Sequence, residues 1–196
     1  MGTNAGLFSS SLGKKYLMAI TGLFLCSFLV IHFLGNIALF TDPVQFNEYT
    51  RFMSSNPIIR VMEIVLVTGF LTHIVDAIIL TRANKKAQPV KYAMNKNKSS
   101  WYSRNMGLTG SVILAFLILH LQSFWYEYKF GEVLMTVDSN GNAIKDMFTI
   151  VKTAFSEWWY SAIYVLAMLL LGSHLNHGFQ SAFQSVGLRH KKYTPT

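Results

Sequence analysis

Four long stretches that are almost free of charged side chains constrain the fold of this chain more than any other feature. They comprise residues 16–40, 58–81, 105–126 and 158–183. A helix needs roughly 20 mainly apolar residues to cross the hydrocarbon core of a bilayer, and lipid cannot satisfy the backbone of a lone strand. The sequence therefore predicts an all-α integral membrane helical bundle with four transmembrane helices, in which residues 1–196 form a single domain.

The composition agrees with a membrane location. Hydrophobic residues make up 52% of the chain and charged residues only 13%, whereas about a quarter of the residues in a soluble domain are charged. The net charge of +8 does not indicate a nucleic-acid partner, because the basic residues lie between the apolar stretches. Lys14 and Lys15 precede an apolar run that is too long for a cleaved signal peptide. The only cysteine, Cys26, has no partner for an internal disulfide.

The distribution of Lys and Arg predicts the orientation of the helices. If the N-terminus is cytoplasmic, twelve of the 17 basic residues lie on the cytoplasmic side. The other five are Arg51, Arg60, Lys129, Lys145 and Lys152. By the positive-inside rule, we expect a multi-pass protein of the inner (cytoplasmic) membrane with both termini in the cytoplasm. Trp158, Trp159 and Tyr160 are then expected to form an aromatic belt at the outer interface.

Histidines occur in all four apolar stretches: His32, His73, His120 and, in the last stretch, both His174 and His177. Consecutive helices cross the membrane in opposite directions, and the first four of these histidines lie past the midpoints of their helices. At about 1.5 Å per residue, these offsets are on the order of 5 Å from the membrane centre. We therefore expect His32 and His120 at one outer level, and His73 and His174 at one inner level.

Two further patterns accompany the histidines. The segments "TGLFLCSFLVIH" (residues 21–32) and "TGSVILAFLILH" (residues 109–120) both place Thr-Gly before nine residues and then a histidine. Gly35, Gly69 and Gly178 each lie three or four residues from the histidine of their helix, which places them on the same helix face. A glycine beside an imidazole leaves room for a large, flat group to approach the backbone.

Two facing imidazoles at one level suit an iron with two axial ligands. Neutral imidazole is a common haem ligand, and helical bundles build such sites from facing side chains. The pattern therefore predicts two haem irons, one held by His32 and His120 and the other by His73 and His174. Two alternatives stay open at this point: the histidines could form hydrogen bonds between helices, or they could form a proton relay.

Four segments carry a resemblance to a known family: "TGLFLCSFLVIHFLGN", "LTHIVDAIILTR" before a basic loop, the histidine of "LILHLQ", and "SEWWYSAIYVL" followed by "HLNHGFQS". In their order and spacing, the chain resembles the cytochrome b membrane-anchor subunit of succinate dehydrogenase and fumarate reductase. More narrowly, it is similar to the single-chain type of these succinate:quinone oxidoreductases, which holds two haems. The resemblance extends over most of the chain.

The resemblance implies two haem b groups and a site for quinone, usually menaquinone. It also implies a flavoprotein subunit and an iron–sulfur subunit, docked on the cytoplasmic face, which hold the FAD and the iron–sulfur clusters. Electrons would pass between the iron–sulfur subunit and membrane quinone through this anchor, as in the tricarboxylic acid cycle enzyme. The chain would have no catalytic residues of its own, and the resemblance allows a dimer of the whole complex.

The family's last haem ligand lies in a pattern like H-x-x-x-G, which selects His174 with Gly178. His177 is the alternative ligand or a polar neighbour of the site, because the two histidines differ by only about 4.5 Å along the helix. The family usually has a fifth span after this ligand, whereas the sequence ends at "GLRHKKYTPT" without another apolar run. Either this member has four spans or the sequence is part of a longer chain, and the candidate ligands precede that point in both cases.

Three acidic residues lie close to the expected sites. The family often has a carboxylate near an outer quinone site, for which Glu48 is the first candidate and Glu63 the alternative. For both, an interfacial acid exposed to water is the competing interpretation. Asp76 could belong to a proton path, or it could pair with a basic residue such as Arg82 or Lys85 at the inner surface.

Two other functions are compatible with the pattern. One is a haem b anchor of another respiratory enzyme, of the hydrogenase or formate dehydrogenase type. The other is a histidine-based transporter of protons or metal ions. A reduced-minus-oxidised optical spectrum separates the transporter from both anchors, and the co-purified subunits separate the two anchors from each other.

Overall fold

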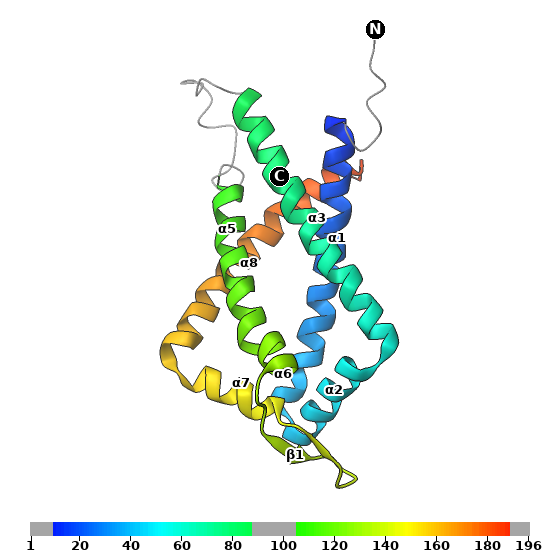
Figure 1. Ribbon diagram of the computed structural model, residues 1–196. Helices are drawn as coiled ribbons and strands as arrows, with labels where there is room; N and C mark the ends of the chain where they lie inside the picture. Colours follow the sequence, from blue (N-terminus) through cyan, green and yellow to red (C-terminus); the bar gives the residue numbers. More distant parts are fainter. Residues whose placement is uncertain (1–9, 88–104, 189–196) are drawn as a thin grey trace. The chain divides into compact units, whose positions relative to one another are not determined.

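The computed structural model describes residues 10–87 and 105–188, and these residues are mainly helical (Figure 1). Its elements are α1 (Ser11–Asn36), the 3₁₀-helix η1 (Ile37–Phe40), α2 (Pro43–Ser55), α3 (Pro57–Ala87), α5 (Met106–His120), the π-helix η2 (Leu121–Tyr126), α6 (Glu127–Phe130), β1 (Met135–Val137), β2 (Ala143–Lys145), α7 (Met147–Ser156) and α8 (Trp158–Ser185). The basic loop that follows α3 and the basic C-terminal residues, which entered the predicted orientation, lie outside the described residues.

Four helical segments are long and apolar enough to cross a membrane: Leu12–Phe40, Pro57–Lys86, Met106–Phe130 and Trp158–Ser185. Many of their large apolar side chains are exposed, including Phe33 and Leu169, at 68% and 69%. Exposed apolar surface of this extent is expected where the surrounding solvent is lipid. The predictions of an all-α bundle, of four spans and of a multi-pass membrane protein are confirmed.

Local capping fixes where two of the helices begin. Asp42 and Asn56 precede α2 and α3, and each side chain accepts backbone N–H bonds from the first turn, the shortest at 2.8 and 2.9 Å. Pro43 and Pro57 follow them at the first helical position, where proline's missing N–H costs nothing. The sequence thus ends one helix and starts the next within a single residue, Asn56.

The chain divides into two compact units, and all four membrane-spanning helices contribute to each of them. The first unit comprises the described parts of Met1–Ser27, Leu66–Gly110 and Gly172–Thr196. The second comprises Phe28–Val65 and Ser111–Leu171. The first unit thus contains His73, His174 and His177, and the second contains His32 and His120, so each predicted ligand pair lies within one unit.

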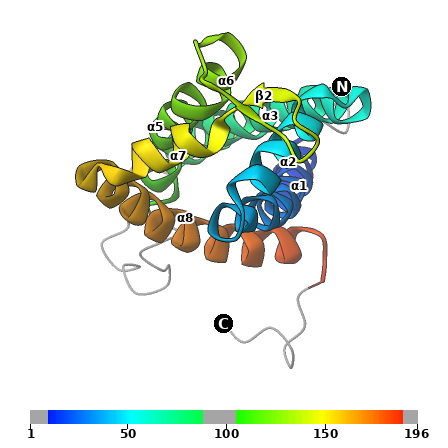
Figure 2. The same ribbon diagram turned by 90° about the horizontal axis from the view of Figure 1, so that it is seen from below.

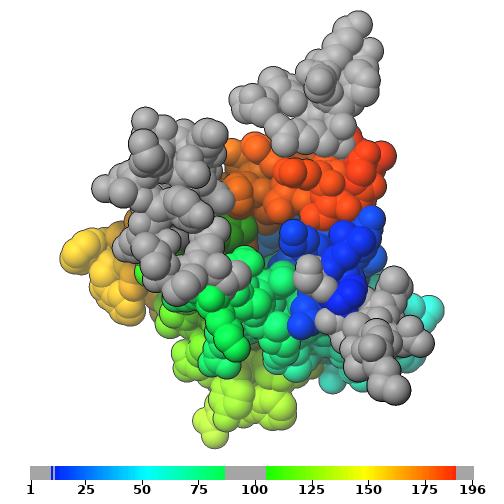
Figure 3. Space-filling model, turned by 90° about the horizontal axis from the view of Figure 1, so that it is seen from above, coloured from blue at the N-terminus to red at the C-terminus, as the bar shows by residue number. Residues whose placement is uncertain are grey.

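In the first unit, the last turns of α8 lie beside the first half of α1, as the neighbouring red and blue atoms of Figure 3 show. Small residues on these segments are buried, with Ala19 exposed by 3% and Ala182 by 6%. Small side chains let helix backbones approach closely in a membrane, where apolar residues gain little by leaving lipid. Phe24 of α1 packs against Gly69 of α3, where an added Cβ would be 2.9 Å from the phenyl ring.

The second unit contains an extramembrane segment that the sequence did not predict. It is formed by α2, α7 and the β1–β2 hairpin (Figure 1), and α2 packs against both α7 and β2 (Figure 2). The buried core of this unit consists of Phe46, Phe124, Met147 and Tyr160. The hairpin strands are antiparallel, with Met135 opposite Lys145.

One buried amide joins the two short helices of this segment. Asn47 of α2 is only 2% exposed. Its Nδ2 donates to Asp146 Oδ1 at 3.0 Å, and its Oδ1 accepts from the backbone N–H of Phe148 at 2.9 Å. Asp146 also caps α7 by accepting from the backbone N–H of Thr149. Because both polar atoms of the Asn47 amide are paired, its burial is not penalised, and α2 is held at the start of α7.

Candidate functional site

The outer histidines, His32 on α1 and His120 at the end of α5, lie next to each other in the second unit. Their ring centres are 5.7 Å apart and the two planes are nearly perpendicular, at 85°. Because a metal–imidazole bond is about 2 Å long and the ring centre lies about 1 Å behind the nitrogen, two imidazoles on one metal have centres about 6 Å apart. The separation of this pair is therefore close to the one that a shared iron requires.

Each outer histidine stacks on a phenylalanine of its own helix. Phe28 stacks on His32 with ring centres 5.4 Å apart, and Phe116 stacks on His120 at 6.0 Å. The interplanar angles are 27° and 29°. Both phenylalanines precede their histidine by four residues, which places them one turn away on the same helix face. The two repeated segments thus share this phenylalanine as well as the histidine, and the two imidazoles have similar stacking partners.

A chain of hydroxyl groups leads from His120 into the aromatic core. His120 Nδ1 is 3.1 Å from the Tyr164 hydroxyl, which is 3.1 Å from the Tyr160 hydroxyl. Tyr160 is only 5% exposed, so the prediction that it belongs to an exposed aromatic belt is wrong. Its ring packs against Phe124 and Phe155 instead, while Trp158 and Trp159 remain exposed, as a belt requires.

The backbone also changes its form at His120. The α-helical hydrogen bonding of α5 ends there, and the π-helix η2 follows directly, from Leu121 to Tyr126. Such π-helical turns are rare in proteins overall, but those that do occur are often found at functional sites. No pattern in the sequence predicted this change.

The inner histidines, His73 on α3 and His174 on α8, both lie in the first unit. Each contacts a threonine hydroxyl on another helix. His73 Nδ1 lies 3.0 Å from Thr21 Oγ1, and His174 Nδ1 lies 3.4 Å from Thr109 Oγ1. Both threonines are the first residue of the repeated segment, which was the available sequence signal for these contacts.

The glycines that border the inner imidazoles are not the predicted ones. A Cβ added at Gly22 would be 3.4 Å from His73 Cε1, and one at Gly110 would be 3.6 Å from His174 Cε1. The space beside Gly35, Gly69 and Gly178 is occupied in this structure by Tyr49, Phe24 and Met106, respectively. The glycines of the repeat thus lie against the histidines, whereas the three predicted glycines allow close packing of other side chains.

His177 lies one turn beyond His174 on α8 and is half-buried. On the same turns of α8, Gln180 Nε2 donates to Asn176 Oδ1 at 3.1 Å. Because Thr109 and Gly110 contact the ring of His174, the geometry favours His174 over His177 as the inner ligand.

Asp76 is buried in the first unit, with 4% exposure. The predicted pairing with Arg82 or Lys85 is wrong for the described residues, because their ion pairs all involve Asp138 or Glu63. The Oδ2 atom of Asp76 has no hydrogen-bond partner among the described residues. Arg82 and Lys85 lie exposed on the last turns of α3, whereas Asp76 faces the interior of the unit.

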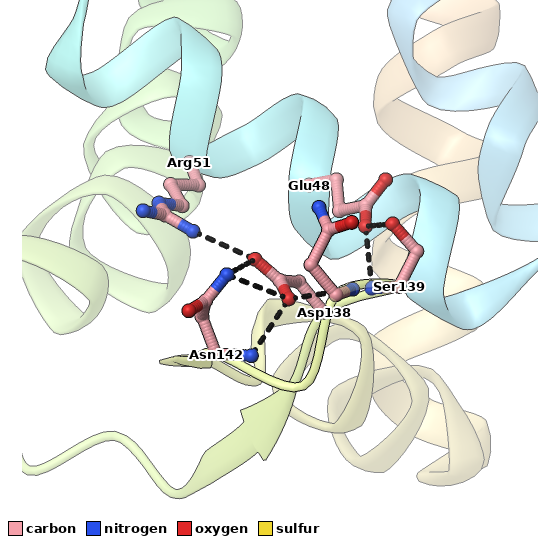
Figure 4. A network of polar contacts seen from close by, with 6 residues as sticks. Glu48, Arg51, Asp138, Ser139 and Asn142 are labelled. Carbon is pink, nitrogen blue, oxygen red and sulfur yellow. Dashed lines mark hydrogen bonds and ion pairs between the residues drawn. The ribbon is translucent and has the colours of Figure 1, made fainter.

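Glu48 lies in a polar network at the tip of the hairpin (Figure 4). Its Oε1 accepts from the backbone N–H and the hydroxyl of Ser139, at 2.7 and 2.5 Å. In the same network, the Asp138 carboxylate accepts from the backbone N–H of Asn142 at 2.8 Å and pairs with Arg51 at 3.0 Å. These interactions, led by the backbone hydrogen bond from Asn142, lower the pKa of Asp138. In these contacts, Glu48 anchors the hairpin to α2.

Glu63 has three partners near the start of α3. It accepts from Trp125 Nε1 at 2.6 Å, pairs with Arg60 at 2.6 Å and pairs with Lys129. An open pocket of about 360 Å³ adjoins this cluster. Its lining residues are Ser54, Arg60, Tyr128, Lys129, Phe130 and Lys145. The carboxylate therefore links α3 to the end of the third span, beside a basic pocket.

The donor chemistry of both pairs fits haem. Among residues 10–87 and 105–188, no three His, Cys, Asp or Glu side chains gather as ligands for a metal ion. Two imidazoles would suffice as protein ligands for haem iron, because the porphyrin supplies its other nitrogen ligands. Comparisons with protein-family models, with curated proteins and with solved structures found no match to this chain.

Proposed function

We propose that this chain is the dihaem cytochrome b membrane anchor of a succinate:quinone oxidoreductase. The observation that supports this proposal best is the contact between the rings of His32 and His120 in one compact unit, while His73 and His174 lie together in the other. Each pair combines residues from two different spanning helices, as bis-histidine sites in helical bundles do. The resemblance of the sequence to this family supplies the identity of the partner subunits.

The residues of the chain have distinct tasks in this proposal. When bound, haem supplies one-electron transfer between its two oxidation states. His32 and His120 hold the outer group, and His73 and His174 hold the inner one. Phe28 and Phe116 stack on the outer ligands and fix their planes. The exposed apolar faces of the four helices keep the assembly in lipid, where membrane quinone is also dissolved.

The partners follow from the same proposal. An iron–sulfur subunit and a flavoprotein subunit dock on the cytoplasmic face and exchange electrons with the inner haem. The basic pocket beside Glu63 lies at the other ends of the spans, away from the proposed docking face, and is lined by cationic side chains.

Purification of the affinity-tagged chain from its native membrane, with mild detergent, tests the proposed partner subunits. We expect a flavin-containing subunit, an iron–sulfur subunit and succinate:quinone activity in the purified sample. Co-purification of hydrogenase or formate dehydrogenase subunits would instead show that the chain is the haem b anchor of another respiratory enzyme.

The proposed orientation has its own test. We expect Asn140, at the hairpin tip, to be outside and Lys86, at the end of α3, to be cytoplasmic, because both are exposed and the basic residues concentrate on the side of Lys86. Single cysteines are introduced at these positions in a Cys26→Ala background and labelled with a membrane-impermeant maleimide. Only the cysteine at position 140 should react in intact cells, and reaction of both from the same side would contradict the orientation.

A further inference from the structure

The hydroxyl of Thr21 makes two kinds of contact, and only one arrangement of its proton satisfies both. Its Oγ1 donates to a carbonyl of its own helix, Leu17 at 2.8 Å or Met18 at 3.2 Å. The same oxygen lies 3.0 Å from His73 Nδ1. A hydroxyl has one proton, and a carbonyl oxygen can only accept a hydrogen bond. The hydroxyl proton of Thr21 therefore forms the hydrogen bond to the backbone carbonyl. The oxygen then accepts from His73, which requires the proton of the neutral imidazole to be on Nδ1.

Thr109 repeats this arrangement at His174. Its Oγ1 donates to the carbonyl of Met106 at 3.1 Å and lies 3.4 Å from His174 Nδ1. The two threonines are buried, with 8% and 4% exposure. In both cases the Nδ1 proton faces the threonine, and Nε2 is left with its lone pair.

The residue after each threonine lies against the same ring. Gly22 borders His73 and Gly110 borders His174, each at ordinary contact distance for an added Cβ. Each Thr-Gly step therefore contacts an imidazole with both of its residues, through a hydrogen bond and through close packing. The same relation occurs twice, at the same position of the two repeated segments, between different pairs of helices.

We propose that Thr21 and Thr109 are positioning residues for the inner site, which hold His73 and His174 in the Nδ1–H tautomer and so present both Nε2 lone pairs to one iron. This inference rests on the proposed function and deepens it. Each repeated segment then serves both sites: its Thr-Gly step orients an inner ligand on a neighbouring helix, and its own terminal histidine is an outer ligand.

A hydrogen bond from Nδ1–H makes the imidazole a better electron donor and favours the oxidised metal. Thr21→Val keeps the volume of the side chain but removes the acceptor. We expect it to raise the midpoint potential of the inner haem, to change its EPR g values and to leave the outer haem unchanged. Thr109→Val should act in the same direction but less strongly, since its contact is longer. Thr21→Ser should restore the potential of the native protein.

Ser27→Ala is the matched control on the same helix. Ser27 Oγ donates to the carbonyl of Phe24 at 2.7 Å, so its removal also deletes a hydroxyl bonded to its own helix, but on an exposed side chain. Neither haem should change in this variant. An inner potential that is the same in Thr21→Val, Thr109→Val and the native protein would overturn the inference, as would equal shifts of both haems.

The tautomers can also be measured without haem. Nitrogen-15 NMR of histidine-labelled protein in lipid, prepared under haem limitation, distinguishes Nδ1–H from Nε2–H for His73 and His174. We expect Nδ1–H for both in the native protein and in Ser27→Ala, and a shift of His73 toward Nε2–H in Thr21→Val. If the protein binds no haem but shows this pattern, the proposed function fails and the positioning by threonine stands. If haem binds and both rings are Nε2–H in the haem-limited protein, the positioning inference fails alone.

Discussion

Replacing His174 with alanine is expected to reduce the haem content from two groups per chain to one and to abolish succinate:quinone activity. A ligand forms a bond to iron that no neighbouring side chain readily replaces. Thr109 and Gly110 contact the ring of His174 on its Nδ1 and Cε1 side, as the proposed positioning of a ligand requires. The remaining haem should be the outer one, since the residues of that pair lie in the other compact unit.

His177→Ala is the matched variant, since it removes the same group one turn away on the same helix. We expect it to retain two haems, with at most a shift of the inner potential or weaker quinone reduction, because the described contacts with Thr109 and Gly110 are made by His174. Haem and protein are measured on the purified variants, and near-native thermal unfolding confirms that each is folded. Loss of the inner haem in His177→Ala together with its retention in His174→Ala would reverse the assignment.

The second large effect is expected at the outer pair. His120→Leu should remove the outer haem and leave most of the inner haem's optical signal. Leucine fills a similar apolar volume beside Phe116 and Phe124, so the loss should come from the missing ligand rather than from a collapsed core. Haem is quantified by pyridine haemochrome, and the two groups are resolved by redox titration.

Tyr164→Phe controls for the neighbouring hydrogen bond. It removes the hydroxyl that lies 3.1 Å from His120 Nδ1 but leaves the imidazole in place. We expect this variant to retain both haems, with a changed outer potential. Two full equivalents of haem in His120→Leu would show that the proposed pairing of His32 with His120 is wrong.

The four spans could be predicted from the sequence because crossing a bilayer depends on a local property, the length of an apolar run. The shared level of His32 and His120 was predictable for a related reason, since depth follows from position along a helix of fixed rise. In contrast, the contact of Thr21 with His73 depends on which helices are neighbours and how each is rotated about its axis. The repeat marked Thr21 and Thr109 as equivalent, but not what they contact.

The polar contacts at the ends of the spans and beyond them could not be predicted from the sequence for another reason. Glu63 binds Trp125 and Lys129, which lie 62 and 66 positions later in the chain. Asn47 binds Asp146 at a separation of 99 positions. Such partners are chosen by tertiary packing, and no local pattern selects them. Tyr160 shows the same limit, because an aromatic residue at the start of a span is suited both to an interfacial belt and to an aromatic core.

The most direct test of the central claim is the haem content of the full-length chain purified in mild detergent from cells supplied with haem precursor. The account predicts two haem b groups per chain, with the reduced-minus-oxidised spectrum of bis-histidine iron, and a fall to one when either pair loses a ligand. A folded chain that contains no haem under these conditions, or that keeps its full haem content when His73 and His120 are both replaced, would contradict the account.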